Sequence, residues 1–263
     1  LMSTPEWAYQ SARALFGHYI RRLDGRIAVS PPARDFVTHF FPGDYHIIPN
    51  GVDIARFSPT VAPLPRFSDG TFNILYLGRI EKRKGLKYLL RAVPVIRQHF
   101  PHTRFLIGGD GPLREGFERL VRQAGWQDVL FLGRVAPADL PALYRTADVF
   151  CAPNTGGESL GLVLLEAMAT GRAVVATSIP GFRSVIEDQV NGLLVPPKKH
   201  DELAWAVCHV LGDRGDRDRL EQAARARAEA YSWAHVGLEV EAYYEELLAM
   251  HRPLWQRPAL HMT

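Results

Sequence analysis

The sequence has little of what marks several common classes of protein. Only two of its 263 residues are cysteines, Cys151 and Cys208, and both lie in apolar surroundings, which argues against a disulfide framework and favours a reducing cytoplasm. No apolar run approaches the roughly 20 residues that span a bilayer, and residues 1–6 do not resemble a signal peptide. The net charge of +3 is too small an excess to indicate nucleic-acid binding. We therefore expect a cytoplasmic protein without a nucleic-acid partner.

What the sequence does contain is an alternation of strand-like and helix-like patterns. With 47% apolar and 22% charged residues, it has the composition of a globular protein. Short apolar strands are expected at residues 72–78, 103–109, 128–133, 148–153, 173–177 and 192–196, with helices at 85–100, 112–125, 137–147, 159–171 and from about 200 onward. Strands this apolar, separated by helices, belong to a parallel sheet that is covered on both faces. The pattern predicts an α/β fold with a doubly wound, Rossmann-like parallel sheet.

Four segments are expected along the chain. Residues 1–57 have a strand, a helix and a short strand at 25–30, 31–41 and 45–53, and we expect the last βαβ unit of a truncated N-terminal domain, since the chain begins with Leu1 rather than Met. Residues 58–70, rich in Pro and Ser, are predicted to be a linker. Residues 71–231 are predicted to form the Rossmann-like domain. In residues 232–263, Ser232 can cap a final helix that returns toward the N-terminal domain.

One strand-to-helix turn has the composition of a phosphate site. Gly156 and Gly157 precede Glu158 after the fourth of these strands, and the next helix is expected to begin near Ser159. A helix N-terminus presents unpaired N–H groups and the positive end of the helix dipole, both of which suit a phosphate. This turn is therefore a candidate anion site.

A basic loop follows the first of these strands. The segment GRIEKRKG, residues 78–85, carries Arg79, Lys82, Arg83 and Lys84. In a doubly wound sheet, ligands bind in the crevice at the carboxyl ends of the strands, where this loop and the turn at 156–158 both leave the sheet. A cationic loop and a helix N-terminus that face one crevice predict a site for a diphosphate. For Lys82 a simpler interpretation is a solvated surface charge that does not bind the diphosphate.

Glu166 is unusual because its neighbours within residues 162–168 are otherwise apolar. A buried carboxylate needs a partner, or its pKa shifts until it is neutral. Counted along a helix, Glu158 and Glu166 would lie roughly 10–12 Å apart. A nucleoside diphosphate-sugar has a hydroxyl-rich ring on each side of its diphosphate, so one carboxylate could accept hydrogen bonds from the ribose and the other from the sugar. The alternatives are a core carboxylate for Glu166 and a helix-cap acid for Glu158.

The segment GGESLGLVLLEAMATGRAVVAT, residues 156–177, resembles the E-x7-E segment of retaining glycosyltransferases of the GT-B fold, family 4 (group 1). Other motifs of that family follow in order: PNGVD at 49–53, GR…RKG at 78–85, GGDGP at 108–112, FLGRV at 131–135 and SW at 232–233. Through APNTGGES at 152–159 and GRIAVS at 25–30, the chain is most similar to phosphatidylinositol alpha-mannosyltransferases. The resemblance covers essentially the whole chain and implies a donor-binding domain at residues 71–231.

The resemblance implies roles for individual residues. Glu158 would lie near the transferred sugar, while Arg79 and Lys84 would neutralise the leaving diphosphate, so these three are the candidate catalytic residues. Glu166 would bind the ribose, and Val135 would contact the base. The candidate donor-binding residues are Arg83, Val135, Ser159, Leu160, Gly161, Leu162 and Glu166, with backbone N–H groups near Gly161 and Leu162 assisting at the diphosphate.

The resemblance also implies what the protein works with. The donor would be a GDP-sugar or a UDP-sugar carrying mannose or another hexose, transferred with retention of its anomeric configuration. No metal or other cofactor is expected, because two cations and a helix dipole already face the diphosphate. The acceptor, a lipid or glycan, would bind mainly to the missing N-terminal half, so this chain alone is expected to be inactive. Residues 12–26, both basic and apolar, are a candidate peripheral membrane contact or the underside of the missing domain.

Some features leave the function open. After Val135 the chain has Ala136, Pro137 and Ala138, where GDP-mannose-dependent relatives carry polar or charged residues, so the base and the sugar stay undecided. A nucleotide-sugar epimerase would use the carboxylates as acid–base groups, and a non-catalytic binding module is the other alternative. The stretch DRGDRDR, residues 213–219, contains an Asp-Arg-Asp triplet like the metal motif of a different glycosyltransferase fold. We interpret it as a solvated stretch between two helices.

Overall fold

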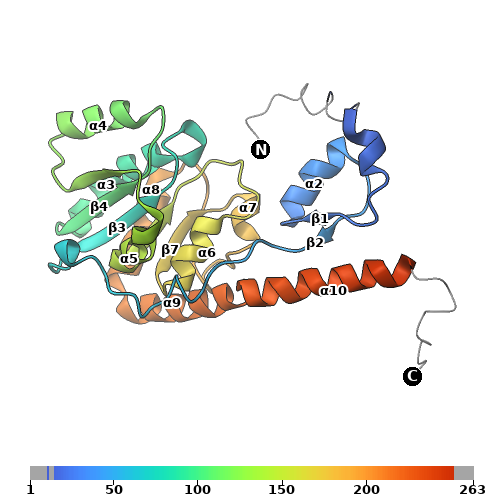
Figure 1. Ribbon diagram of the computed structural model, residues 1–263. Coiled ribbons are helices and arrows are strands. Elements are labelled where there is room, and N and C mark those ends of the chain that lie inside the picture. The colour runs from blue at the N-terminus through green and yellow to red at the C-terminus, as the bar shows by residue number, and fades with distance from the viewer. Residues whose placement is uncertain (1–10, 12–14, 252–263) are drawn as a thin grey trace. The chain divides into compact units, whose positions relative to one another are not determined.

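The computed structural model describes residues 11 and 15–251 and divides the chain into two compact units (Figure 1). One unit joins the residues up to Gly51 with those from Trp233 onward, and the other is Val52–Ser232. Among the described residues, no helix combines the length and the apolar character needed to cross a membrane.

The larger unit is built on a six-stranded parallel sheet with the strand order β5-β4-β3-β6-β7-β8. Its strands are β3 (Phe72–Leu77), β4 (Thr103–Gly108), β5 (Val129–Gly133), β6 (Val149–Ala152), β7 (Ala173–Thr177) and β8 (Leu193–Val195). The chain first adds strands on one side of β3 and then turns back to add the others beyond it. The doubly wound sheet predicted from the sequence is confirmed, and its switch point lies between β3 and β6, where such sheets bind ligands.

Helices cover both faces of this sheet. They are α3 (Leu86–His99), α4 (Arg114–Gln123), α5 (Leu140–Thr146), α6 (Leu162–Ala169), α7 (Pro180–Arg183), α8 (His200–Gly212) and α9 (Arg214–Glu229), with short 3-10 turns η1 (Pro65–Phe67), η2 (Lys82–Lys84) and η3 (Pro137–Asp139). Because successive strand residues point to opposite faces, Ile74 packs with α3 and α8 while Leu75 packs with α5 and α6. The unit therefore has two buried apolar clusters, one on each face of the sheet.

Two helix boundaries differ from the predicted ones. Helix α6 begins at Leu162, so the prediction of a helix start near Ser159 is wrong, and the helical spacing assumed between the two glutamates does not apply. Gly161 is the reason: its φ of 99° is left-handed, and a Cβ there would lie 2.9 Å from the ring of Phe182. The stretch DRGDRDR, residues 213–219, does not lie between two helices but forms the start of α9, which begins at Arg214. The Asp213 side chain caps this helix by accepting a hydrogen bond from the N–H of Asp216.

Residues 58–70, predicted as a linker, belong to the larger unit and pack against its core. In this segment Phe67 is 8% exposed, and Phe57 just before the segment is 4% exposed. The guanidinium of Arg225 donates to the carbonyl of Phe57 at 3.1 Å, and the N–H of Val52 donates to the carbonyl of Tyr231 at 2.8 Å. Pro and Ser indicate irregular backbone, but the large apolar residues between them fix the segment to the core.

The smaller unit contains the strands β1 (Ile27–Ala28) and β2 (His46–Ile47), which pair in parallel, with α2 (Pro31–Phe40) between them and α10 (Trp233–His251) beside them. The hydroxyl of Tyr243 in α10 accepts a hydrogen bond from the N–H of Arg26, and its ring stacks on His46. A Cβ at Gly51 would lie 2.5 Å from the ring of Trp233. Close packing in this unit therefore explains why a glycine and a tryptophan occur in the PNGVD and SW motifs.

Candidate functional site

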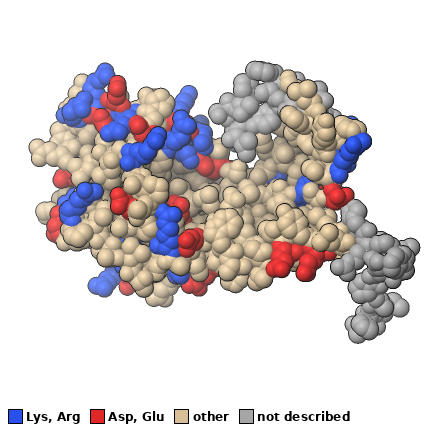
Figure 2. Space-filling model, in the orientation of Figure 1, with Lys and Arg blue, Asp and Glu red and all other residues tan. Residues whose placement is uncertain are grey.

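A pocket of about 700 Å³ opens at the carboxyl ends of β3, β4 and β5. It is lined by Leu77, Gly78, Arg79, Gly109, Asp110, Gly111, Arg134, Val135, Leu140, Val163 and Glu166. Figure 2 shows Lys and Arg side chains gathered over α4 and the loop that follows β3, with acidic side chains among them. The pocket lies at the edge of the sheet where the fold predicts a ligand, and its volume suits a small molecule of ordinary size.

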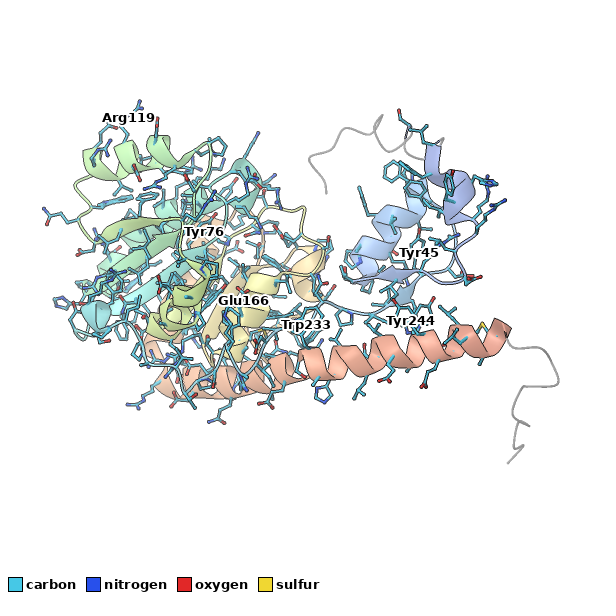
Figure 3. The ribbon with its side chains drawn as sticks, in the orientation of Figure 1. Tyr45, Tyr76, Arg119, Glu166, Trp233 and Tyr244 are labelled. Atoms are coloured by element: carbon cyan, nitrogen blue, oxygen red, sulfur yellow. The ribbon has the colours of Figure 1, made fainter. Side chains whose placement is uncertain are left out.

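Glu166 projects from α6 into this pocket (Figure 3). Its Oε2 atom accepts a hydrogen bond of 2.7 Å from the hydroxyl of Tyr144, which is wholly buried. Burial raises the pKa of Glu166, while the Tyr144 hydrogen bond and the charge of Arg56 lower it. The pKa of Tyr144 is well above its usual value because of burial and of the carboxylate beside it. Glu166 is thus a carboxylate with one oxygen held by the protein and a pocket in front of it.

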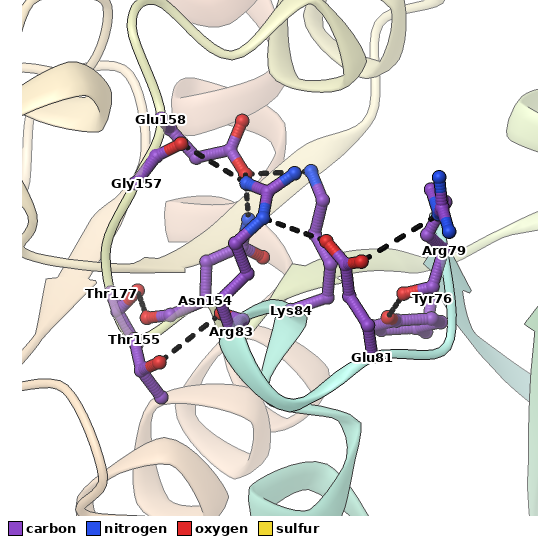
Figure 4. Close-up of polar contacts among 10 residues, drawn as sticks. All are labelled: Tyr76, Arg79, Glu81, Arg83, Lys84, Asn154, Thr155, Gly157, Glu158 and Thr177. Carbon is purple, nitrogen blue, oxygen red and sulfur yellow. Dashed lines mark hydrogen bonds and ion pairs between the residues drawn. The ribbon is translucent and has the colours of Figure 1, made fainter. Parts of the chain in front are cut away.

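A second carboxylate, Glu158, lies in the loop between β6 and α6 and has three donors on one oxygen (Figure 4). Its Oε1 atom lies 2.6 Å from Nζ of Lys84, 2.7 Å from Nη1 of Arg83 and 2.9 Å from Nδ2 of Asn154. The side chains of Lys84 and Glu158 are only 16% and 15% exposed. Within the described residues, Oε2 of Glu158 accepts no hydrogen bond, so this oxygen is available to a ligand.

Backbone contacts hold the loops after β3 and β6 against each other. Gly85 has a φ of 71°, and a Cβ there would lie 1.9 Å from the carbonyl oxygen of Pro153. The N–H of Thr155 donates to the carbonyl of Arg83 at 2.8 Å. Because only glycine permits this approach, the sequence RKG places Arg83 and Lys84 beside the loop that carries Glu158.

Arg79 connects the pocket to this charged cluster. It lines the pocket, and its Nε atom lies 3.6 Å from Glu81, which also pairs with Arg83 at 2.7 Å. The Arg79 side chain is 72% exposed, so its guanidinium can reorient toward a ligand. Lys82 is exposed and takes part in no ion pair of the described residues, in agreement with its interpretation as a solvated charge.

The structure therefore divides the predicted site residues into neighbouring groups. Arg79, Val135 and Glu166 line the pocket, whereas Arg83, Lys84 and Glu158 form the charged cluster. Gly161 and Leu162 stand at the start of α6, with Ser159 and Leu160 in the loop before it. The roles given to these residues stay predictions. Asp110 and Arg134, which line the pocket, lie in the motifs GGDGP and FLGRV but were not among the predicted site residues. Tyr144 was not predicted either, because in the sequence it resembles an apolar core position of its helix.

Residues 71–213 match the family model of glycosyl transferases group 1. Over 232 residues the chain is 41% identical to a phosphatidyl-myo-inositol mannosyltransferase of Mycolicibacterium smegmatis, which covers 86% of this chain and 58% of that protein. The corresponding protein of Mycobacterium tuberculosis is 40% identical over 231 residues, 85% of this chain and 60% of that protein. The chain thus spans less than two thirds of the length of these curated relatives.

Solved structures agree with this fold. Sucrose-phosphate synthase from Thermosynechococcus elongatus superposes with a TM-score of 0.79 at 27% identity, over 94% of this chain and 63% of that one. The C-terminal domain of a glycosyl transferase group 1 family protein (LpcC) from Francisella tularensis gives a TM-score of 0.61 at 26% identity, over 70% of this chain and 100% of that one. The larger unit thus has the GT-B type of fold that these glycosyltransferases share. The chain belongs to the glycosyl transferases group 1 family.

Proposed function

We propose that this chain supplies the donor-binding half of a retaining glycosyltransferase, which moves mannose or another hexose from a GDP-sugar or UDP-sugar to a lipid or glycan acceptor. The observation that carries the proposal is the position of Arg79, which belongs both to the pocket lined by Glu166 and to the ion pairs that lead to Glu158. A nucleoside diphosphate-sugar extended along this path would have its ribose near Glu166, its diphosphate near the cations and its sugar near Glu158.

The cations would act on the leaving group. When the bond to the sugar breaks, negative charge grows on the diphosphate, and preorganised positive groups lower the barrier by stabilising that charge. Lys84 and Arg83 are held on Glu158 at 2.6 and 2.7 Å, so they are ordered before a ligand arrives. Helix α6 adds the unpaired N–H groups of its first turn. With these groups facing the diphosphate, we propose that donor binding needs no metal ion.

Each of the two carboxylates would orient one ring of the donor. Oε2 of Glu158 would accept hydrogen bonds from hydroxyls of the transferred sugar, since its Oε1 already has three protein donors. Oε1 of Glu166 would accept from the ribose, since its Oε2 is bound to Tyr144. Orientation of this kind lowers the barrier by fixing the reacting groups in a productive geometry.

The acceptor is proposed from the relatives. Because these two similar proteins are named phosphatidyl-myo-inositol mannosyltransferases, we favour mannose as the sugar and a phosphatidyl-myo-inositol lipid as the acceptor. Exposed apolar and basic residues near the N-terminus fit a peripheral membrane contact at the inner face of the membrane: Leu15, Phe16, Tyr19, Arg21, Arg22 and Leu23. Residues 12–14 of the stretch predicted for this contact lie outside the described residues.

Calorimetric titration of this chain with GDP and with UDP, each with and without EDTA, tests the donor site. We expect one of the two nucleotides to bind, and to bind with the same affinity in the presence and absence of EDTA. Because the chain spans 58% of the length of its mycobacterial relative, we expect no sugar transfer by this chain alone when a donor and an acceptor are added. Binding that EDTA abolishes would contradict the metal-free site, and transfer by the chain alone would contradict its role as one half. A sugar epimer formed without any acceptor would favour the epimerase instead.

A further inference from the structure

Tyr144 is a buried tyrosine whose hydroxyl has a single polar partner in the part of the chain that the structure describes. It lies on α5, its side chain has no exposed surface, and its hydroxyl donates to Oε2 of Glu166 at 2.7 Å. Its ring packs against Phe150 at 5.3 Å and Phe57 at 5.9 Å between centroids. With apolar rings around it, the hydroxyl is fixed in one direction, toward the carboxylate.

Glu166 stands between this tyrosine and the pocket. Among the described residues, the Glu166 carboxylate has Tyr144 as its only hydrogen-bond partner, so its Oε1 atom is left for a ligand that enters the pocket. The charged groups that face it are Arg56, which is anchored to the carbonyl of Pro137, and the pocket residues Arg79, Asp110 and Arg134. An acid in such partly buried surroundings is neutral more readily than an exposed one.

We propose that Tyr144 is a positioning residue of the donor site, which holds Glu166 ionised and oriented so that its free oxygen accepts hydrogen bonds from the ribose hydroxyls. The inference rests on the proposed function, in which Glu166 meets the ribose. Tyr144 itself touches no substrate, because it is wholly buried behind the carboxylate. Its influence on binding therefore passes through Glu166 alone.

The consequence is a dependence on pH. Burial already raises the pKa of Glu166, and the Tyr144 hydrogen bond opposes that shift. Without the hydroxyl the pKa rises further, so a larger fraction of Glu166 is protonated at a given pH below that pKa. A neutral carboxyl accepts weaker hydrogen bonds than a carboxylate. Loss of the hydroxyl therefore weakens binding most at low pH, and the loss shrinks as the pH rises.

The test is Tyr144→Phe, titrated with the nucleoside diphosphate that the wild-type chain binds, from pH 6 to pH 8.5. We expect about a tenfold weaker Kd at pH 6, the size of a hydrogen bond to a charged group, and a much smaller loss at pH 8.5. The 2′,3′-dideoxy nucleotide should bind the variant and the wild type equally. In a Glu166→Gln background, Tyr144→Phe should have no further effect. Tyr231→Phe is the matched control, since that buried hydroxyl donates to the carbonyl of Ser184.

Three results would overturn the inference: an equal loss with the ribose and the dideoxy nucleotide, a loss that does not vary with pH, or an additive effect with Glu166→Gln. Thermal unfolding of each variant shows whether it folds, and Tyr144→Phe keeps the ring that fills the core. If the wild type binds neither GDP nor UDP, the proposed function fails. If it binds one of them and Tyr144→Phe changes nothing at any pH, only the inference about Tyr144 fails.

Discussion

Replacement of Lys84 by Ala tests the cationic part of the site. Its Nζ atom lies 2.6 Å from Glu158, and its side chain is 16% exposed, whereas Lys82 two residues earlier is exposed. A hydrogen bond to a charged group contributes about 1.5–3 kcal/mol. Lys84→Ala should therefore weaken nucleoside diphosphate binding about 10-fold to 150-fold, while Lys82→Ala should change it little.

The arrangement also predicts a rescue. Without Lys84, Arg83 is the one charged partner that the described residues still offer to the Glu158 carboxylate, which then repels the diphosphate more strongly. Adding Glu158→Gln to Lys84→Ala should therefore recover part of the affinity for the bare diphosphate. Calorimetry at constant ionic strength measures both effects, with circular dichroism to verify folding. Equal losses for Lys84→Ala and Lys82→Ala, or a further loss in the double variant, would show that Lys84 does not bind the diphosphate.

Two other parts of the molecule, Gly161 and Glu221, can be tested beside the two carboxylates of the site. Glu166→Gln should weaken binding of the bare nucleoside diphosphate, whereas Glu158→Gln should matter mainly once a sugar is attached; titration with both ligands separates them. Gly161→Ala should lower the free energy of unfolding by about 1–3 kcal/mol, because the φ of Gly161 is left-handed. Gly116 lies in α4 with open space around it, so Gly116→Ala should raise the free energy of unfolding by about 0.5–1 kcal/mol. Urea denaturation measures both changes. Burial raises the pKa of Glu221 to about 7. The folded protein therefore loses stability as the pH rises from about 4.5, the pKa of this group in the unfolded chain, to about 7. Glu221→Gln should accordingly raise the unfolding temperature more at pH 8 than at pH 5.

Much of the fold could be predicted because buried parallel strands leave an uninterrupted apolar pattern. β3 to β8 all occur where such runs stand between turn residues, and the strand order follows from the rules for doubly wound sheets. Local geometry was less accessible. The start of α6 depends on a left-handed glycine packed under Phe182, and α7 is a helix of four residues with no periodicity to detect.

The candidate site was only partly predictable for a related reason. Charged residues in loops, such as Arg79, Lys84 and Glu158, can be assigned to the carboxyl edge of a sheet from sequence position alone. The Tyr144–Glu166 hydrogen bond joins two helices that are separate in the sequence, and a tyrosine in an apolar helix pattern carries no sign of a polar partner. Such contacts depend on how the helices pack and become visible only in three dimensions.

We propose that one nucleoside diphosphate-sugar site runs from Glu166 past Arg79 and Lys84 to Glu158. A crystal structure of this chain with GDP or UDP, grown in the presence of EDTA, tests it most directly. We expect the ribose hydroxyls within hydrogen-bond distance of Glu166 and the diphosphate between the cations and the first turn of α6. A nucleotide bound elsewhere on the chain, or one in this pocket with its phosphates turned away from Arg79 and Lys84, would contradict it.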